Sequence, residues 1–320
     1  MKKRKILIIL LLLLFAAPVL ISAESSGRPE GLTVSPPLQE LNIKQGESVT
    51  KKIKVTNPIK QQVKVYPIAL DFTAKGETGE PDFLKATDEK RTYSLANWIT
   101  FSKNYLVLEP QEVEEYEFTI KSPQDSEPGG HYGAVFFSSE PPKASGDVSQ
   151  VTISTMVGSL ILVKTPGFVV ENAQIETYQA PYFSFNPPVD FNIRISNMGN
   201  VHFKPKGDIL VKDLFGKAAD TVKVNAQEGN VLPGTTRRFE AKWEPKTSIL
   251  YPIGRYTAEI KLKYGDSQKE LTAVLVFWII PLWFIILIAV TILFIIYMVF
   301  RKRRKKKNNP KDKNVMDLRK

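Results

Sequence analysis

The sequence predicts an all-β ectodomain of two tandem immunoglobulin-like antiparallel β-sandwiches, followed by one transmembrane α-helix. Three observations predict this fold class. Between about residues 30 and 276, apolar and polar residues alternate in short runs, and turn-forming residues separate the runs; a stretch of 28 uncharged residues, Ala273–Phe300, overlaps their end. Alternation with a period of two is typical of strands with one buried face, and about 20 apolar residues cross a bilayer core.

Residues 1–23 have the three-part pattern of a secretory signal peptide. Basic residues precede an apolar run from Ile6 to Phe15, and a site of small residues ends at Ala23, before Glu24. Charge, apolar core and cleavage site in this order are typical of signal peptides. An uncleaved membrane anchor is the alternative, because apolar residues continue to Ile21.

Pro166-Gly167 is the predicted boundary between two sandwiches, residues 30–165 and residues 168–276. Each part is near the size of an immunoglobulin-like sandwich, roughly 100 residues. Apolar residues occupy every second position in windows such as Tyr256–Leu262, so one face of each strand is expected in the core. Residues 73–93 are polar and turn-rich and lack alternation, so we expect an insertion there in the first sandwich.

A transmembrane helix is predicted at residues 278–300, with a basic cytoplasmic tail at 301–320. The residues expected at the membrane interfaces are aromatic near the ends of the span and basic after it: Trp278, Trp283, Tyr297, Arg301, Lys302, Arg303 and Arg304. Trp and Tyr gather at both membrane surfaces, and clustered cations remain on the cytoplasmic side. We therefore expect a single-pass protein of the cell membrane, with its body extracellular and its tail cytoplasmic.

The formal net charge of +11 comes from the two ends of the chain. Residues 1–5 and 301–320 contain 15 of the 44 Lys and Arg residues and 2 of the 33 Asp and Glu residues. Both basic segments adjoin apolar runs, as expected of charge that orients a membrane protein. The cations Arg301–Lys307 have no aromatic residues between them to stack on bases. The pattern indicates attraction to anionic lipid and no nucleic-acid partner.

Residues that could perform catalysis are few. The chain has no cysteine and 2 histidines, His131 and His202, which fall in different predicted sandwiches. We expect His131 to pack in a turn and His202 to be a surface residue. The carboxylates between Glu112 and Glu117 alternate along one predicted strand, whereas acid/base catalysis needs two carboxylates in unlike environments across a cleft. The sequence therefore predicts a protein that is not an enzyme and binds no cofactor or metal.

Residues 148–163 contain no charge and alternate like a strand. An uncharged strand at a sheet edge can accept a strand from another chain. The candidate partner-binding residues in this stretch are Val151, Thr152, Ile153, Ser154 and Thr155. The alternative is an internal strand pair that bends at Gly158 and is fully paired within its own domain.

Three segments resemble the fimbrial-chaperone-like proteins of Gram-positive surfaces. Leu32–Gln39 is similar to the opening of their first domain, Pro128–Phe137 to its penultimate strand, and Ser196–Asn200 to part of their second, membrane-proximal domain. The order of signal peptide, two sandwiches, helix and basic tail is similar to that of WxL-interacting cell-surface proteins. The resemblance covers nearly the whole chain and implies a first domain that contacts peptidoglycan and a second that contacts a protein partner.

We therefore expect a membrane-anchored extracellular binding or scaffold protein that contacts a cell-wall polymer or a surface-protein partner through its β-sandwiches. The alternative is an accessory subunit of a membrane transport or secretion complex, with the single helix as its docking element. Nothing in the sequence sets the ligand or the oligomeric state.

The predicted orientation can be tested with protease on intact cells. Because the cations Arg301–Lys307 favour the cytoplasmic side, protease added outside should digest the body and spare an epitope attached at Lys320. Immunoblotting of the body and of the Lys320 epitope, after protease treatment of intact and of lysed cells, measures the digestion of each part. Loss of the Lys320 epitope from intact cells would contradict the orientation.

Overall fold

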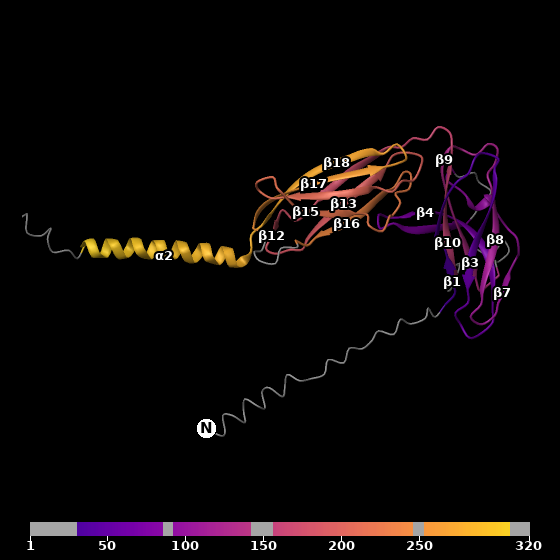
Figure 1. The fold of residues 1–320 in the computed structure, drawn as a ribbon, viewed down its shortest axis with the longest axis horizontal. Coiled ribbons are helices and arrows are strands. Elements are labelled where there is room, and N and C mark those ends of the chain that lie inside the picture. The colour runs from indigo at the N-terminus through magenta and orange to yellow at the C-terminus, as the bar shows by residue number, and fades with distance from the viewer. Residues whose placement is uncertain (1–30, 86–91, 142–155, 246–252, 308–320) are drawn as a thin grey trace, which may run out of the picture.

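A computed structural model describes residues 31–85, 92–141, 156–245 and 253–307. The predicted fold class is confirmed, because the strands form two successive β-sandwiches and one long helix follows them (Figure 1). The predicted signal peptide, the candidate partner-binding residues Val151–Thr155 and the tail beyond Lys307 lie outside the described residues.

The first sandwich is built from two sheets. One has the order β1-β3-β8-β6, and the other the order β2-β10-β9-β4-β5, with β7 paired to β4. The elements are β1 (Thr33–Ser35), β2 (Leu38–Asn42), β3 (Ser48–Thr56), β4 (Val63–Lys75), β5 (Glu80–Lys85), η1 (Ala96–Trp98), β6 (Ile99–Phe101), β7 (Leu106–Leu108), β8 (Val113–Lys121), β9 (Gly129–Ser138) and β10 (Met156–Thr165).

Alternation along the strands places the core of the first sandwich between its sheets. In β3, Ile53 and Val55 are fully buried, while Lys52 lies on the solvent face and pairs with Glu115 of β8 at 3.4 Å. Tyr116 and its neighbours on β8 complete the core from the same sheet. Glu115 and Glu117 therefore lie on a wet strand face, as the sequence predicts, whereas Glu114 is half-buried on the side of Tyr116 and pairs with Lys103 at 2.7 Å.

The second sandwich repeats this plan with a three-stranded and a five-stranded sheet. Their orders are β11-β13-β16 and β12-β18-β17-β14-β15. The strands are β11 (Ala173–Gln179), β12 (Phe183–Ser184), β13 (Val189–Asn197), β14 (Lys206–Lys212), β15 (Ala218–Val224), β16 (Thr236–Trp243), β17 (Gly254–Tyr264) and β18 (Lys269–Ile279). Trp243, Phe191 and Phe277 pack ring against ring in its core.

Residues 73–85 differ from the predicted insertion, because they form the end of β4 and all of β5, a hairpin whose turn is Gly76–Gly79. Strand β5 is the edge of its sheet, and the turn of the hairpin reaches the second sandwich. The hairpin therefore lacks the regular alternation of apolar and polar residues that a strand between core and solvent shows. Two pairings within the mainly antiparallel sheets are parallel, β2 with β10 and β12 with β18.

Helix α2 (Leu282–Lys307) begins four residues after the predicted start at 278 and continues through the basic run. Trp278 lies in β18 instead, because Phe277 and Ile279 on either side of it are buried in the sandwich core. Pro281 directly precedes the helix. Within the described residues, Leu282–Arg304 is the one segment long and apolar enough to cross a membrane, with a mean hydropathy of 3.0.

An asparagine occupies the same structural position in both sandwiches. Asn57 follows β3 and Asn197 ends β13, and both are almost completely buried. Each Oδ1 accepts a hydrogen bond from the backbone N–H two residues later. Each Nδ2 donates to the carbonyl four residues later and to a carbonyl distant in the sequence, that of Leu108 at 3.2 Å or Val231 at 2.9 Å. The amide thus ties a strand end to another part of its sandwich.

Asn57→Leu should lower the free energy of unfolding by about 3 kcal/mol or more, because several buried backbone groups lose their partner together. Urea unfolding of the purified protein measures the change. Asn104→Leu, at an exposed position of the same sandwich, is the control and should change it by less than about 0.5 kcal/mol. Equal effects of the two substitutions would contradict a structural role for the Asn57 amide.

Candidate functional site

The β4–β5 hairpin attaches the first sandwich to the second. The carbonyl of Glu77 in its turn accepts a hydrogen bond of 2.8 Å from the backbone N–H of Arg238 on β16. The Glu77 carboxylate accepts two hydrogen bonds from the Arg194 guanidinium on β13, of which the one from Nε is 2.7 Å long. These bonds lower the pKa of Glu77. The hairpin therefore lies against the three-stranded sheet of the second sandwich, as Figure 1 shows.

Tyr132 of β9 forms a second, buried contact between the sandwiches. Its hydroxyl oxygen accepts a hydrogen bond of 3.0 Å from the backbone N–H of His202 and lies 3.2 Å from Nδ1 of the same residue. Burial, together with the charge of nearby Lys164, lowers the pKa of His202 to about 4. At neutral pH the imidazole is therefore uncharged, and its Nδ1 can accept a hydrogen bond from the Tyr132 hydroxyl.

Ion pairs and a backbone bond surround this contact. Lys204 pairs with Glu40 at 2.9 Å, and Lys164 pairs with Asp266 at 3.1 Å. The N–H of Gly130 donates to the carbonyl of Asn200 at 2.8 Å. Contacts at the hairpin, at Tyr132 and at these pairs restrain the angle between the sandwiches at separate points.

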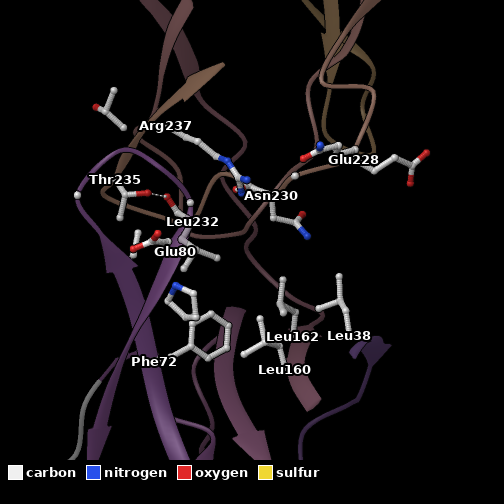
Figure 2. Close-up of a pocket in the computed structure, with 17 residues that line it drawn as sticks. Leu38, Phe72, Glu80, Leu160, Leu162, Glu228, Asn230, Leu232, Thr235 and Arg237 are labelled. Carbon is white, nitrogen blue, oxygen red and sulfur yellow. Dashed lines mark hydrogen bonds between the residues drawn. The ribbon is translucent and has the colours of Figure 1, made fainter. Parts of the chain in front are cut away.

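A groove with a cavity of about 190 Å³ lies between the sandwiches, bounded by the hairpin on one side. Its floor is apolar and comes from the outer face of the six-stranded sheet of the first sandwich, from Leu38, Phe72, Leu160 and Leu162. The opposite wall, residues 227–237, belongs to the second sandwich. Figure 2 shows Arg237 and Asn230 above this floor, with Leu232 between them and Phe72.

Arg237 is the cation of the groove. A Cβ on Gly79 of the hairpin or on Gly229 of the second sandwich would overlap its guanidinium, so the group lies between two bare backbones, one from each sandwich. One of its terminal nitrogens donates to the carbonyl of Asn230 at 2.8 Å, while its buried Nε has no hydrogen-bond partner among the described residues. Burial lowers its pKa, although an arginine stays charged at any physiological pH.

In the described part of the chain, no carboxylate lies within 4.0 Å of the Arg237 guanidinium. A half-buried cation beside an apolar floor can bind an anionic group whose neighbouring atoms are apolar, and the low local dielectric strengthens such an ion pair. No cluster of three or more His, Asp or Glu side chains that could hold a metal ion occurs among the described residues.

The sequence-predicted residues fall in different places. Strand β10 is internal between β2 and β9 over Leu160–Lys164, whereas Met156–Ser159 pairs with β9 alone among the described strands. On α2, residues 301–304 are exposed, as are Trp283 and Tyr297. Trp283, Tyr297 and residues 301–304 do not line the groove, whereas Leu160 and Leu162 of β10 belong to its floor.

Both histidines differ from the prediction. His131 is buried, but it lies in strand β9 and not in a turn, with Nε2 2.9 Å from the carbonyl of Glu127. The prediction that His202 is a surface residue is wrong, because the residue is 3% exposed and lies in the contact between sandwiches. Sequence reasoning also missed Arg237, because in the sequence it occupies an ordinary polar position of an alternating strand. The two glycines that flank its guanidinium, Gly79 and Gly229, lie far apart in the sequence.

No family model matches the chain, and no curated protein matches it. Among solved structures, it is similar to the class 5 fimbriae chaperone CfaA, at 16% identity over 79% of this chain and 100% of that one, with a TM-score of 0.37. It is also similar to the E. coli chaperone DraB, at 14% identity over 76% of this chain and 97% of that one, with a TM-score of 0.35.

A third similar structure is the CsuC-CsuE chaperone–tip adhesion subunit pre-assembly complex of Acinetobacter baumannii, at 12% identity over 75% of this chain and 97% of that one, with a TM-score of 0.36. Fimbrial chaperones are thus among the solved structures similar to this chain. At these TM-scores the likeness says nothing about function, and membership of the WxL-interacting family stays a prediction.

The burial of His202 predicts that acid destabilises the protein. Its pKa is about 4 in the folded chain against 6.5 ordinarily, so the unfolded chain binds more protons between these values. The free energy of unfolding is therefore highest above about pH 6.5, where His202 is neutral in both states, and it falls as the pH drops toward 4. The loss at about pH 5 is on the order of 2 kcal/mol. Urea unfolding at neutral pH and at about pH 5 measures it.

His202→Gln provides the matched comparison. Glutamine can still accept a hydrogen bond from Tyr132 but does not titrate, so this variant should lose less stability over the same pH interval. Equal losses in the two proteins would show that other groups cause the acid sensitivity.

Proposed function

We propose that this protein is a membrane-anchored extracellular scaffold that binds an extended segment of a partner protein in the groove between its sandwiches. The bound segment presents an apolar side chain to the groove floor and a carboxylate to Arg237. The role is binding without chemical turnover.

The observation that carries the proposal is the Arg237 guanidinium, which lies half-buried beside an apolar floor with no carboxylate partner among the described residues. Desolvating a cation without pairing it costs free energy, so a fold that keeps one in such a place favours an anionic ligand. The bonds of the hairpin and of Tyr132 fix both walls before any ligand binds, which reduces the entropy lost on binding.

Among the described residues, a backbone edge without a paired strand adjoins the groove. Strand β2 begins opposite Leu160, whose N–H donates to the carbonyl of Pro37 at 2.9 Å. Backbone groups alternate in direction along a strand. The N–H and C=O of Gly158, two residues before Leu160, therefore point to the side on which Leu160 meets β2, and no described strand pairs with them there. A partner strand added there would lead directly into the groove at Leu160, which supports an extended segment as the ligand.

The apolar floor favours a protein segment over a wall polymer. The floor side chains Leu38, Phe72 and Leu160 offer no hydrogen-bond partner to a sugar hydroxyl, and a polar group buried there unpaired would cost free energy. An apolar side chain placed on the same surface is stabilised by about 25 cal/mol for each Å² removed from water.

The length of α2 supports the membrane anchor. The 23 residues of Leu282–Arg304 extend about 35 Å as a helix, enough for a hydrocarbon core about 30 Å thick. The helix follows β18 after two residues, Ile280 and Pro281, so the second sandwich stands next to the membrane and the groove faces away from it.

Photo-crosslinking in cells tests the groove. A photoreactive residue in place of Gln227, which lines the groove, should form a covalent adduct with an envelope protein. Arg237→Gln should reduce the adduct about tenfold or more, because a hydrogen-bonded charge contributes about 1.5 to 3 kcal/mol. Adduct yield is measured by immunoblotting of the tagged chain, and the adduct is identified by mass spectrometry.

Arg255→Gln is the control, since Arg255 is exposed on β17 at the far end of the second sandwich. It should leave the adduct unchanged. An adduct with polysaccharide only, or equal reduction by both substitutions, would overturn the proposal of a protein segment bound at Arg237.

A further inference from the structure

Exposed apolar side chains gather at one end of the second sandwich. In the β14–β15 turn, Phe215 is 91% exposed and Leu214 59%. Toward the other edge of the same sheet, the segment around β12 exposes Tyr182 at 72% and Phe185 at 44%. Exposure of this extent is unusual for aromatic side chains of a folded domain and indicates that something other than water contacts them.

Strand register places both groups at the end from which α2 departs. The carbonyl of Ser184 accepts a hydrogen bond of 3.0 Å from the N–H of Ile280, two residues before the helix. Lys212 lies opposite Thr257, and Thr257 opposite Val276, so the β14–β15 turn extends past the level of Val276 toward the helix. Figure 1 shows β12 beside the start of α2.

The β14–β15 turn fixes the outward direction of its apolar residues. Its Asp213 carboxylate accepts hydrogen bonds of 2.9 Å from the backbone N–H groups of Phe215 and Lys217. The Asp213 backbone closes the turn with a 2.9 Å bond to the carbonyl of Lys217, and Gly216 adopts the positive φ of 79° that the turn requires. The Asp213 carboxylate is thus engaged within the turn, and the tip presents Leu214, Phe215 and the cation Lys217 to the outside.

The geometry points to a lipid contact: we propose that the Leu214-Phe215 tip, together with the aromatic residues around β12, inserts into the interfacial region of the outer leaflet around the start of α2. Aromatic and aliphatic residues next to lysine are the composition that binds such an interface. The inference rests on the proposed membrane anchor. Its consequence is a second sandwich that contacts the bilayer at several points and cannot swivel freely about the helix.

The absence of cysteine from the chain allows a direct test. The full-length chain is reconstituted in phosphatidylcholine vesicles with single cysteines that carry an environment-sensitive fluorophore: Lys217→Cys at the tip, Ile292→Cys in the middle of the span, and Met198→Cys as control. Met198 is also apolar and 52% exposed, but it follows β13 at the opposite end of the second sandwich. Two spin-labelled lipids are used: one carries the label near the end of the acyl chain and quenches a fluorophore in the middle of the span, and the other carries it high on the chain and quenches fluorophores near the interface.

We expect quenching of the fluorophore at Ile292 and at Lys217, with at least about threefold more quenching at Lys217 than at Met198. Adding Leu214→Ser and Phe215→Ser to Lys217→Cys should bring quenching at the tip down to the Met198 level. Both residues are exposed, so these substitutions should not affect folding.

Each other outcome overturns a distinct claim. Quenching at Ile292 with none at Lys217 leaves the anchor in place and rejects the lipid contact of the tip. Absence of quenching at Ile292 rejects the anchor and the lipid contact together. Quenching at Lys217 that persists without the two apolar side chains rejects their role in it.

Discussion

The molecule depends on the contact that fixes the angle between its two sandwiches. A single hydroxyl, that of Tyr132, accepts the backbone N–H of His202 and lies against its imidazole in a buried site, and the Glu77 hairpin binds Arg194 and Arg238 at a second point. Two separated contacts define an angle, whereas one would permit rotation. The Leu232 side chain fills the space between them by packing on Phe72, Tyr132 and Leu162.

The fixed angle creates the groove and places a cation in it. Because the hairpin turn lies against the second sandwich, Gly79 faces the Arg237 guanidinium from one side while Gly229 faces it from the other. The same arrangement leaves the outer face of the six-stranded sheet of the first sandwich partly covered, so Leu38 and Leu160 become the floor of the groove. The contact between the sandwiches and the proposed binding groove are therefore the same structural feature, and a change that loosened the contact would also open the groove.

The two ends of the second sandwich have opposite character. The end at His202 and Asn200 is polar and buried against the first sandwich, whereas the end at Phe215 and Phe185 is apolar and exposed beside the helix. The sandwich therefore separates a groove from the start of an apolar helix, and its long strands β17 and β18 set the distance between the two. A rigid spacer of this kind presents the groove at a constant height if the helix crosses a membrane.

The sequence by itself determined the strands, the order of sandwiches and helix, and the wet carboxylate face of β8, because these follow from the period of apolar residues in a local window. It placed Trp278 in the helix, since an uncharged window cannot separate a buried strand from a membrane span. Only the tertiary structure decided that His202 is buried, that residues 73–85 form a docking hairpin, and that Arg237 faces an apolar floor. Each depends on contacts between residues more than 60 positions apart, and such contacts leave no period in the local sequence.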